Sequence, residues 1–99
     1  MQVIQPAVAG TLESSDIQIR ILPNPGGGLE LQLQSIVLAQ FGDAIRATIR
    51  AVLEEFGVTD ACVDAVDKGA LDWVIRARMQ AACCRACGVG FDWKGEDAP

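Results

Sequence analysis

The chain has 99 residues, of which 51% are hydrophobic and 21% charged, and its formal net charge is −5. This length and apolar content predict one folded domain with a modest core rather than a disordered chain. The acidic balance disfavours nucleic acid and anionic membranes as partners, and every apolar run is far too short to span a membrane. Because the first ten residues lack the features of a secretory signal, we expect a cytoplasmic protein.

Three short segments in the first third of the chain are expected to be strands. Residues 6–12 form a short apolar run. In residues 17–22, Ile17, Ile19 and Ile21 alternate with the polar Gln18 and Arg20. Residues 13–16, with the sequence ESSD, are turn material between these two strands. After the breaker PNPGGG, residues 29–34 alternate leucine with Glu and Gln, which indicates a third strand.

Two details of these strands carry further expectations. Gly10 suggests a bulge or a close backbone approach inside the first strand. Arg20 and Glu30 fall on the polar faces of the second and third strands, where they could form a weak pair. One apolar and one polar face per strand is typical of an antiparallel sheet that is covered on one side only.

A helix is expected from Ser35 to about Phe56, because apolar residues recur there at spacings of three and four. Gly57 is a plausible stop signal for it. Its expected core-facing residues are Leu38, Phe41, Ile45, Ile49, Val52 and Phe56. Asp43 and Arg46 form an i, i+3 pair that we expect on the solvated face, and Gly42 suggests a close approach, with core packing preferred over partner contact.

A second helix is expected over residues 70–86, with Asp67 as its cap and with Gly88 and Gly90 ending it. Its expected core-facing residues are Leu71, Val74, Ile75, Ala82 and Ala86. Positive charge in the later turns of this helix would suit the helix dipole, and it comes from Arg76, Arg78 and Arg85. Trp73 lies beside the apolar stripe, and its partial exposure would favour an interface role.

Residues 58–66, between the two helices, are rich in valine and are expected to form a strand in a more central position of the sheet. The predicted order is βββαβα, an α+β fold with a four-stranded, mostly antiparallel sheet and both helices on its apolar face. We expect residues 1–90 to form the single domain. Residues 91–99 are expected to be a loose tail, or one that docks through Phe91 and Trp93.

The chain contains four cysteines and no histidine. Cys83, Cys84 and Cys87 cluster near the end of the second predicted helix, and Cys62 stands alone. Although a C-x-x-C pair invites a metal or redox interpretation, the ligands for a structural zinc site are too few, so we favour simple packing and expect no metal. The missing histidine removes the commonest general base, and we expect no catalytic residue in this chain.

Three segments carry a resemblance that composition alone does not give. They are QPAVAGTLESSD at residues 5–16, QFGDAIRATI at 40–49 and DKGALDWVIRAR at 67–78. In order and spacing they resemble the acyl carrier protein of citrate lyase, its gamma subunit. The likeness covers residues 2–88.

The resemblance implies a covalent prosthetic group on Ser14, the serine of the AGTLES segment. In that family the group is phosphoribosyl dephospho-coenzyme A, joined to the serine through a phosphodiester, and it carries acetyl and citryl thioesters. The implied partners are the alpha (acyltransferase) and beta (lyase) subunits, which together convert citrate to acetate and oxaloacetate, and the transferase that attaches the group. Ser15 is then an ordinary turn residue.

Other functions remain open at this point. The carrier subunits of malonate decarboxylase and of citramalate lyase are close relatives, and substrate choice lies in other subunits. A non-catalytic interaction module without a covalent group is the alternative from a different class.

Overall fold

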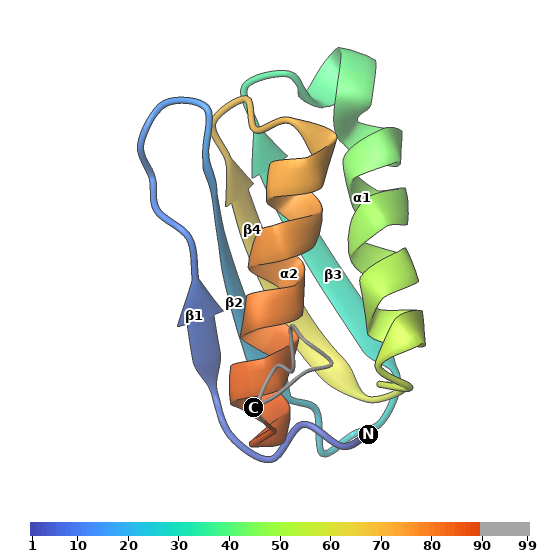
Figure 1. Cartoon of the computed structure of the whole chain (residues 1–99). Helices are drawn as coiled ribbons and strands as arrows, with labels where there is room; N and C mark the ends of the chain where they lie inside the picture. Colours follow the sequence, from blue (N-terminus) through green and yellow to red (C-terminus); the bar gives the residue numbers. More distant parts are fainter. Residues whose placement is uncertain (90–99) are drawn as a thin grey trace.

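The computed structural model describes residues 1–89, which form one four-stranded sheet and two helices (Figure 1). In chain order the elements are β1 (Ala7–Ala9), β2 (Ile17–Pro23), β3 (Leu29–Ser35), α1 (Leu38–Glu55), β4 (Ala61–Asp67) and α2 (Asp72–Cys87). The predicted order βββαβα is confirmed. The expectations for Gly90 and for the tail over 91–99, including Phe91 and Trp93, lie outside the described residues. Neither of the two described helices is long and apolar enough to cross a bilayer.

The strands lie side by side in the order β1-β2-β4-β3. The β1–β2 and β2–β4 pairs are antiparallel, whereas β3 and β4 are parallel, so the mostly antiparallel sheet that the sequence predicted is confirmed. A parallel pair needs a crossover connection, and α1 supplies it. The valine-rich strand β4 takes the central position that its sequence indicated.

This strand order contradicts the predicted contact between Arg20 and Glu30. Strand β4 separates β2 from β3, so the residue beside Arg20 in the register is Asp64, and the residue beside Glu30 is Cys62. The expected weak pair was based on β2 and β3 being neighbours, which they are not.

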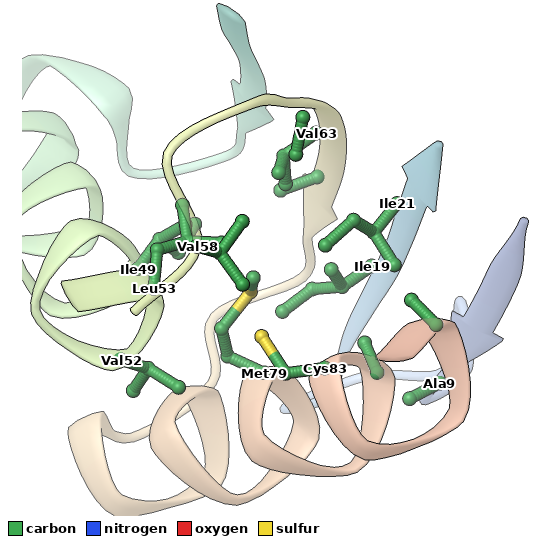
Figure 2. Close-up of a cluster of buried hydrophobic side chains, with 14 of the residues drawn as sticks. Ala9, Ile19, Ile21, Ile49, Val52, Leu53, Val58, Val63, Met79 and Cys83 are labelled. Carbon is green, nitrogen blue, oxygen red and sulfur yellow. The ribbon is translucent and has the colours of Figure 1, made fainter. Parts of the chain in front are cut away.

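Both helices cover the same face of the sheet, and the core lies between these two layers (Figure 1). The three isoleucines of β2, Ile17, Ile19 and Ile21, are completely buried. Figure 2 shows Met79 and Cys83 of α2 in the same cluster as the β2 isoleucines and apolar residues of α1. Burial of one such side chain stabilises the folded state by roughly 1.5–3 kcal/mol, so the three isoleucines hold β2 firmly against the helices.

Most of the predicted apolar stripe of α1 faces the core, but its first turn does not. Ile45, Ile49 and Val52 are buried, whereas Leu38 is 42% and Phe41 53% exposed. The first turn of α1 extends past the ends of the neighbouring strands, so the sheet cannot cover it (Figure 1). The helix also begins later than predicted, because Ser35 still belongs to β3.

The end signals of both helices were predicted correctly. Gly57 follows α1 with a φ of 64°, and Gly88 ends α2 in the left-handed conformation with a φ of 70°. Along α2, Ile75, Ala82 and Ala86 are buried as expected. The prediction that Leu71 faces the core is wrong, since this residue is exposed at the start of α2. The prediction also missed two core residues of α2, Met79 and Cys83.

Candidate functional site: the turn that carries Ser14

The loop between β1 and β2 starts at Gly10, where the chain passes very close to β2. Gly10 has a φ of 86°, and a Cβ atom at this position would lie 1.8 Å from the carbonyl oxygen of Ile17. Only glycine fits such a contact. The close approach predicted for Gly10 is therefore confirmed, and it explains why β1 ends at Ala9 instead of continuing to residue 12.

Residues 13–16 form a tight turn, which we call the anchor turn. The N–H of Asp16 donates to the carbonyl oxygen of Glu13 at 3.2 Å, which places Ser14 and Ser15 at the two central positions. Ser15 has a φ of 65°, an uncommon conformation for a residue with a side chain, and Ser14 is exposed. Among the described residues, nothing hydrogen-bonds to the Ser14 hydroxyl, which leaves that oxygen accessible from solution.

Backbone contacts tie the anchor turn to the end of β4. The N–H of Ser15 donates to the carbonyl oxygen of Lys68 at 2.8 Å, and the N–H of Lys68 donates to that of Asp16 at 2.8 Å. These two bonds continue the antiparallel β2–β4 ladder, whose last register pair is Ile17 with Asp67. The backbone beside Ser14 is thus held on an extension of the sheet.

The carboxylate of Asp16 joins the two ends of the loop. One of its oxygens, Oδ2, accepts from the hydroxyl of Thr11 at 2.7 Å and from the N–H of Thr11 at 3.2 Å. The other, Oδ1, accepts from the N–H of Ile17 at 2.7 Å. Asp16 is 9% exposed, so these bonds replace water around most of the carboxylate.

Arg78 of α2 forms a bidentate contact with the carboxylate of Asp16. Its Nε donates to Asp16 Oδ1 at 3.0 Å, and its Nη2 donates to Oδ2 at 2.9 Å. This hydrogen-bonded guanidinium is the main reason why the pKa of Asp16 falls from 3.8 to about 2; burial opposes the shift, and the Thr11 and Ile17 bonds assist it. The carboxylate is therefore ionised at neutral pH and paired with a cation.

Asp67 was predicted to cap α2, and this is wrong. The N-cap position belongs to Leu71, which has no side chain that could cap the helix. The carboxylate of Asp67 is buried and instead accepts from the Ser35 hydroxyl at 2.8 Å and from the N–H groups of Gly69 and Ala70 at 3.1 and 2.9 Å. It fixes the connection from β4 to α2, which is the segment that holds the anchor turn.

The three sequence segments that carried the resemblance contact one another in the fold. The first, 5–16, contacts the third, 67–78, through Asp16 and Arg78. The second, 40–49, contacts the third where the Thr48 hydroxyl donates to Asp72 Oδ1 at 2.6 Å. The first and third segments therefore form the surroundings of Ser14, and the second contacts the third.

The arginines of α2 have specific partners, and Arg85 lies in the last turn of the helix, where its charge suits the dipole as predicted. Arg76 forms an ion pair with Glu55 of α1, and Arg78 forms one with Asp16. Arg85 donates to the carbonyl oxygen of Val8 at 2.7 Å.

Two predictions for α1 concern its exposed face and Gly42. The Asp43–Arg46 pair is present on the exposed face at 3.5 Å, as predicted. Around Gly42 the closest atoms belong to side chains of the same helix, so its expected close approach to the sheet does not occur.

The cysteine cluster lies away from solvent inside the core. Cys83, Cys84 and Cys87 are all buried, and burial raises the pKa of the Cys83 thiol to about 12. Within residues 1–89, no three His, Cys, Asp or Glu side chains come close enough together to hold a metal ion. The buried position agrees with the packing role that we favoured for this cluster.

Thr11, Lys68 and Arg78 are the residues of this site that sequence reasoning missed. Their contacts join positions far apart in the chain, and periodicity carries no information on such contacts. A usable signal was nevertheless present. Arg78 ends the third segment and Asp16 ends the first, so two opposite charges end two of the segments that carry the resemblance.

Comparison with known proteins places the chain among carrier subunits. The family described as malonate decarboxylase delta subunit (MdcD) matches residues 4–86. A citrate lyase acyl carrier protein from Vibrio cholerae serotype O1 is 56% identical over 94% of this chain and 96% of the relative. One from Streptococcus equi subsp. equi is 52% identical over 99% of this chain and 97% of the relative.

A solved structure shares the fold. It is a chain in the crystal structure of a Pseudomonas malonate decarboxylase hetero-tetramer in complex with malonate. The match has a TM-score of 0.64 and covers 83% of this chain and 88% of that chain, at 22% identity. At this identity the likeness concerns the fold alone.

Proposed function

Since the chain belongs to the family of citrate lyase acyl carrier proteins, we propose that it is the acyl carrier (gamma) subunit of a citrate lyase. In this proposal Ser14 holds phosphoribosyl dephospho-coenzyme A through a phosphodiester, and residues 1–90 form the carrier domain. The thiol of the group carries acetyl and citryl units during cleavage of citrate to acetate and oxaloacetate. The chain supplies no catalytic side chain, and the alpha and beta subunits do the chemistry.

The observation that carries this proposal is the exposed Ser14 hydroxyl on a firmly held turn. A transferase must reach the serine oxygen from solution, and Ser14 offers it without a competing hydrogen bond among the described residues. The added phosphodiester brings a negative charge near Asp16, whose own charge is already paired with Arg78. The paired Asp16 therefore repels an anionic group on Ser14 less than a free carboxylate would.

The anchor turn would fix the position at which the prosthetic group is attached, while the group itself moves. A flexible tether raises the concentration of its end at a nearby site to roughly the millimolar range, provided that it can span the distance. Since Asp16, Lys68 and Arg78 fix the backbone around Ser14, the orientation of the folded domain on a partner subunit also sets where the group begins.

Mass analysis of the protein purified with its complex tests the proposal. We expect an adduct with the mass of the phosphoribosyl dephospho-coenzyme A group on the peptide that contains Ser14. Ser14→Ala should abolish the adduct, and the matched variant Ser15→Ala should keep it. An unmodified Ser14 in a fully active complex would overturn the proposal, and an adduct that is lost only in Ser15→Ala would move the site by one residue.

A malonate decarboxylase carrier is the second candidate, favoured by the family match. It would use the same serine, so the adduct does not separate the two functions. Assays of the assembled complex with citrate, citramalate and malonate do, because the partner subunits select the substrate. Turnover of malonate in place of citrate would establish the second candidate.

A further inference from the structure

A pocket of about 310 Å³ opens between the starts of α1 and α2, where β4 passes into α2. Its lining is mainly apolar and includes Val37, Phe41, Ile45, Leu71, Asp72 and Ile75. Two of these side chains are much more exposed than core residues usually are, with Phe41 at 53% and Leu71 at 62%. Exposed apolar side chains around a hollow indicate a ligand or a partner.

This pocket lies close to Ser14. The N–H of Ser15 donates to the carbonyl oxygen of Lys68 at 2.8 Å, and the next residue, Gly69, lines the pocket. Adding the lengths of these links bounds the separation between the Cα atoms of Ser14 and Gly69 at about 15 Å. A group attached to Ser14 can therefore reach the pocket with its first few units.

The size and charge of the pocket favour one part of the proposed prosthetic group as its ligand. Ligand pockets usually span about 300–1,000 Å³, so this one accepts a single ring system rather than the whole group. Asp72 at its rim, together with the apolar lining, disfavours the diphosphate. A neutral flat base suits the remaining surface, since the Phe41 ring offers a face for stacking.

We propose that this pocket binds the adenine base of the group attached to Ser14, so that only the pantetheine part beyond the diphosphate swings between partner subunits. This inference rests on the proposed function, because it requires the covalent group. It assigns Phe41 as the stacking surface, with Ile45 and Ile75 at the pocket floor. It also explains why the first turn of α1 keeps apolar residues that the sheet does not cover.

The test is an NMR comparison of the protein with and without the group, after intact mass has shown that Ser14 is modified. We expect nuclear Overhauser contacts between the adenine protons and Phe41 and Ile75, together with methyl shifts at Ile45. Phe41→Ala should remove the adenine contacts without reducing attachment. Leu29→Ala is the matched control, because Leu29 is also an exposed apolar residue, 44% exposed, but lines a different hollow. It should leave the contacts intact.

The possible failures are distinguishable. If Ser14 is modified but only residues of the anchor turn shift, the adenine site is overturned and the proposed function stands. Contacts from the pantetheine methyl groups to Phe41, in place of adenine contacts, would also overturn it. If the active complex contains no adduct on Ser14, the proposed function fails, and this inference fails with it.

Discussion

Arg78 of α2 and Asp16 of the anchor turn form a bidentate pair across 62 residues of sequence, with Nη2 and Oδ2 at 2.9 Å. The same carboxylate also binds Thr11 and Ile17, so one side chain connects the start of the loop, its end and a helix. The position of Ser14 therefore depends on a residue from the last helix of the described fold.

Removing the charge of Asp16 is expected to destabilise the protein. Asp16→Asn weakens both contacts to Arg78, and we expect a loss of about 1–3 kcal/mol in the free energy of unfolding. A double-mutant cycle with Arg78→Met in urea denaturation measures the coupling between the two residues. Asp43→Asn, in the exposed pair with Arg46, is the control and should change little. Equal effects of Asp16→Asn and Asp43→Asn would contradict the structural role of the pair.

The same carboxylate predicts how stability depends on pH. The pKa of Asp16 is lowered to about 2 from 3.8, so the folded state binds the proton less readily than the unfolded state. The stabilisation is fully present above about pH 4 and is lost as the pH falls towards 2. Urea denaturation between pH 2 and 6 should show the difference between wild type and Asp16→Asn shrinking at the acidic end. A constant difference across this range would count against the shift.

Gly10 should not tolerate a side chain. Gly10→Ala places Cβ against the carbonyl oxygen of Ile17, whereas Gly28 has a similar φ of 88° and open space around it. Gly28→Ala should cost only the left-handed conformation, about 1–2 kcal/mol. We expect Gly10→Ala to cost a further 1–3 kcal/mol or so from the clash, measured by chemical denaturation. Similar losses in the two variants would show that the loop adjusts easily.

The cysteines should differ in their reactivity in the folded protein. Cys62 is half-buried on β4, whereas Cys83 lies fully inside the core, where burial raises its pKa to about 12. Alkylation with iodoacetamide at pH 8, followed by peptide mass analysis, should label Cys62 first and Cys83 last. Labelling in denaturant, where the four thiols should react at similar rates, is the control. Early labelling of Cys83 in the native state would show that the core opens readily.

The sequence predicted the elements and the sheet better than it predicted the contacts between them. Ile17, Ile19 and Ile21 alternate with polar residues, which is enough to predict a strand and its buried face. Periodicity cannot show that β4 inserts between β2 and β3, and for this reason the Arg20–Glu30 pair was wrong. Pairing of distant segments depends on the whole chain.

For the candidate site, too, the sequence predicted the local turn but not the contacts around it. Ser14 came from a resemblance, and its place at the centre of an exposed turn agrees with the turn expected for ESSD. The predicted role of Asp67 was wrong because a short polar residue before a helix usually caps it, and here the N–H groups of the following loop bind the same carboxylate. Leu38 and Phe41 matched the core pattern, and only the relative lengths of α1 and the sheet exclude them from it.

The long reach of the Arg78 contact also has a consequence for the order of events when the protein is made. During translation Ser14 is synthesised early. The residues that hold its turn are synthesised more than fifty residues later, and they are Lys68 and Arg78. A nascent chain or a short peptide with the AGTLESSD sequence therefore lacks the surface that an attachment enzyme would meet on the finished fold. For the proposed group on Ser14, folding would therefore come first and modification second, and misfolded copies would lack the group.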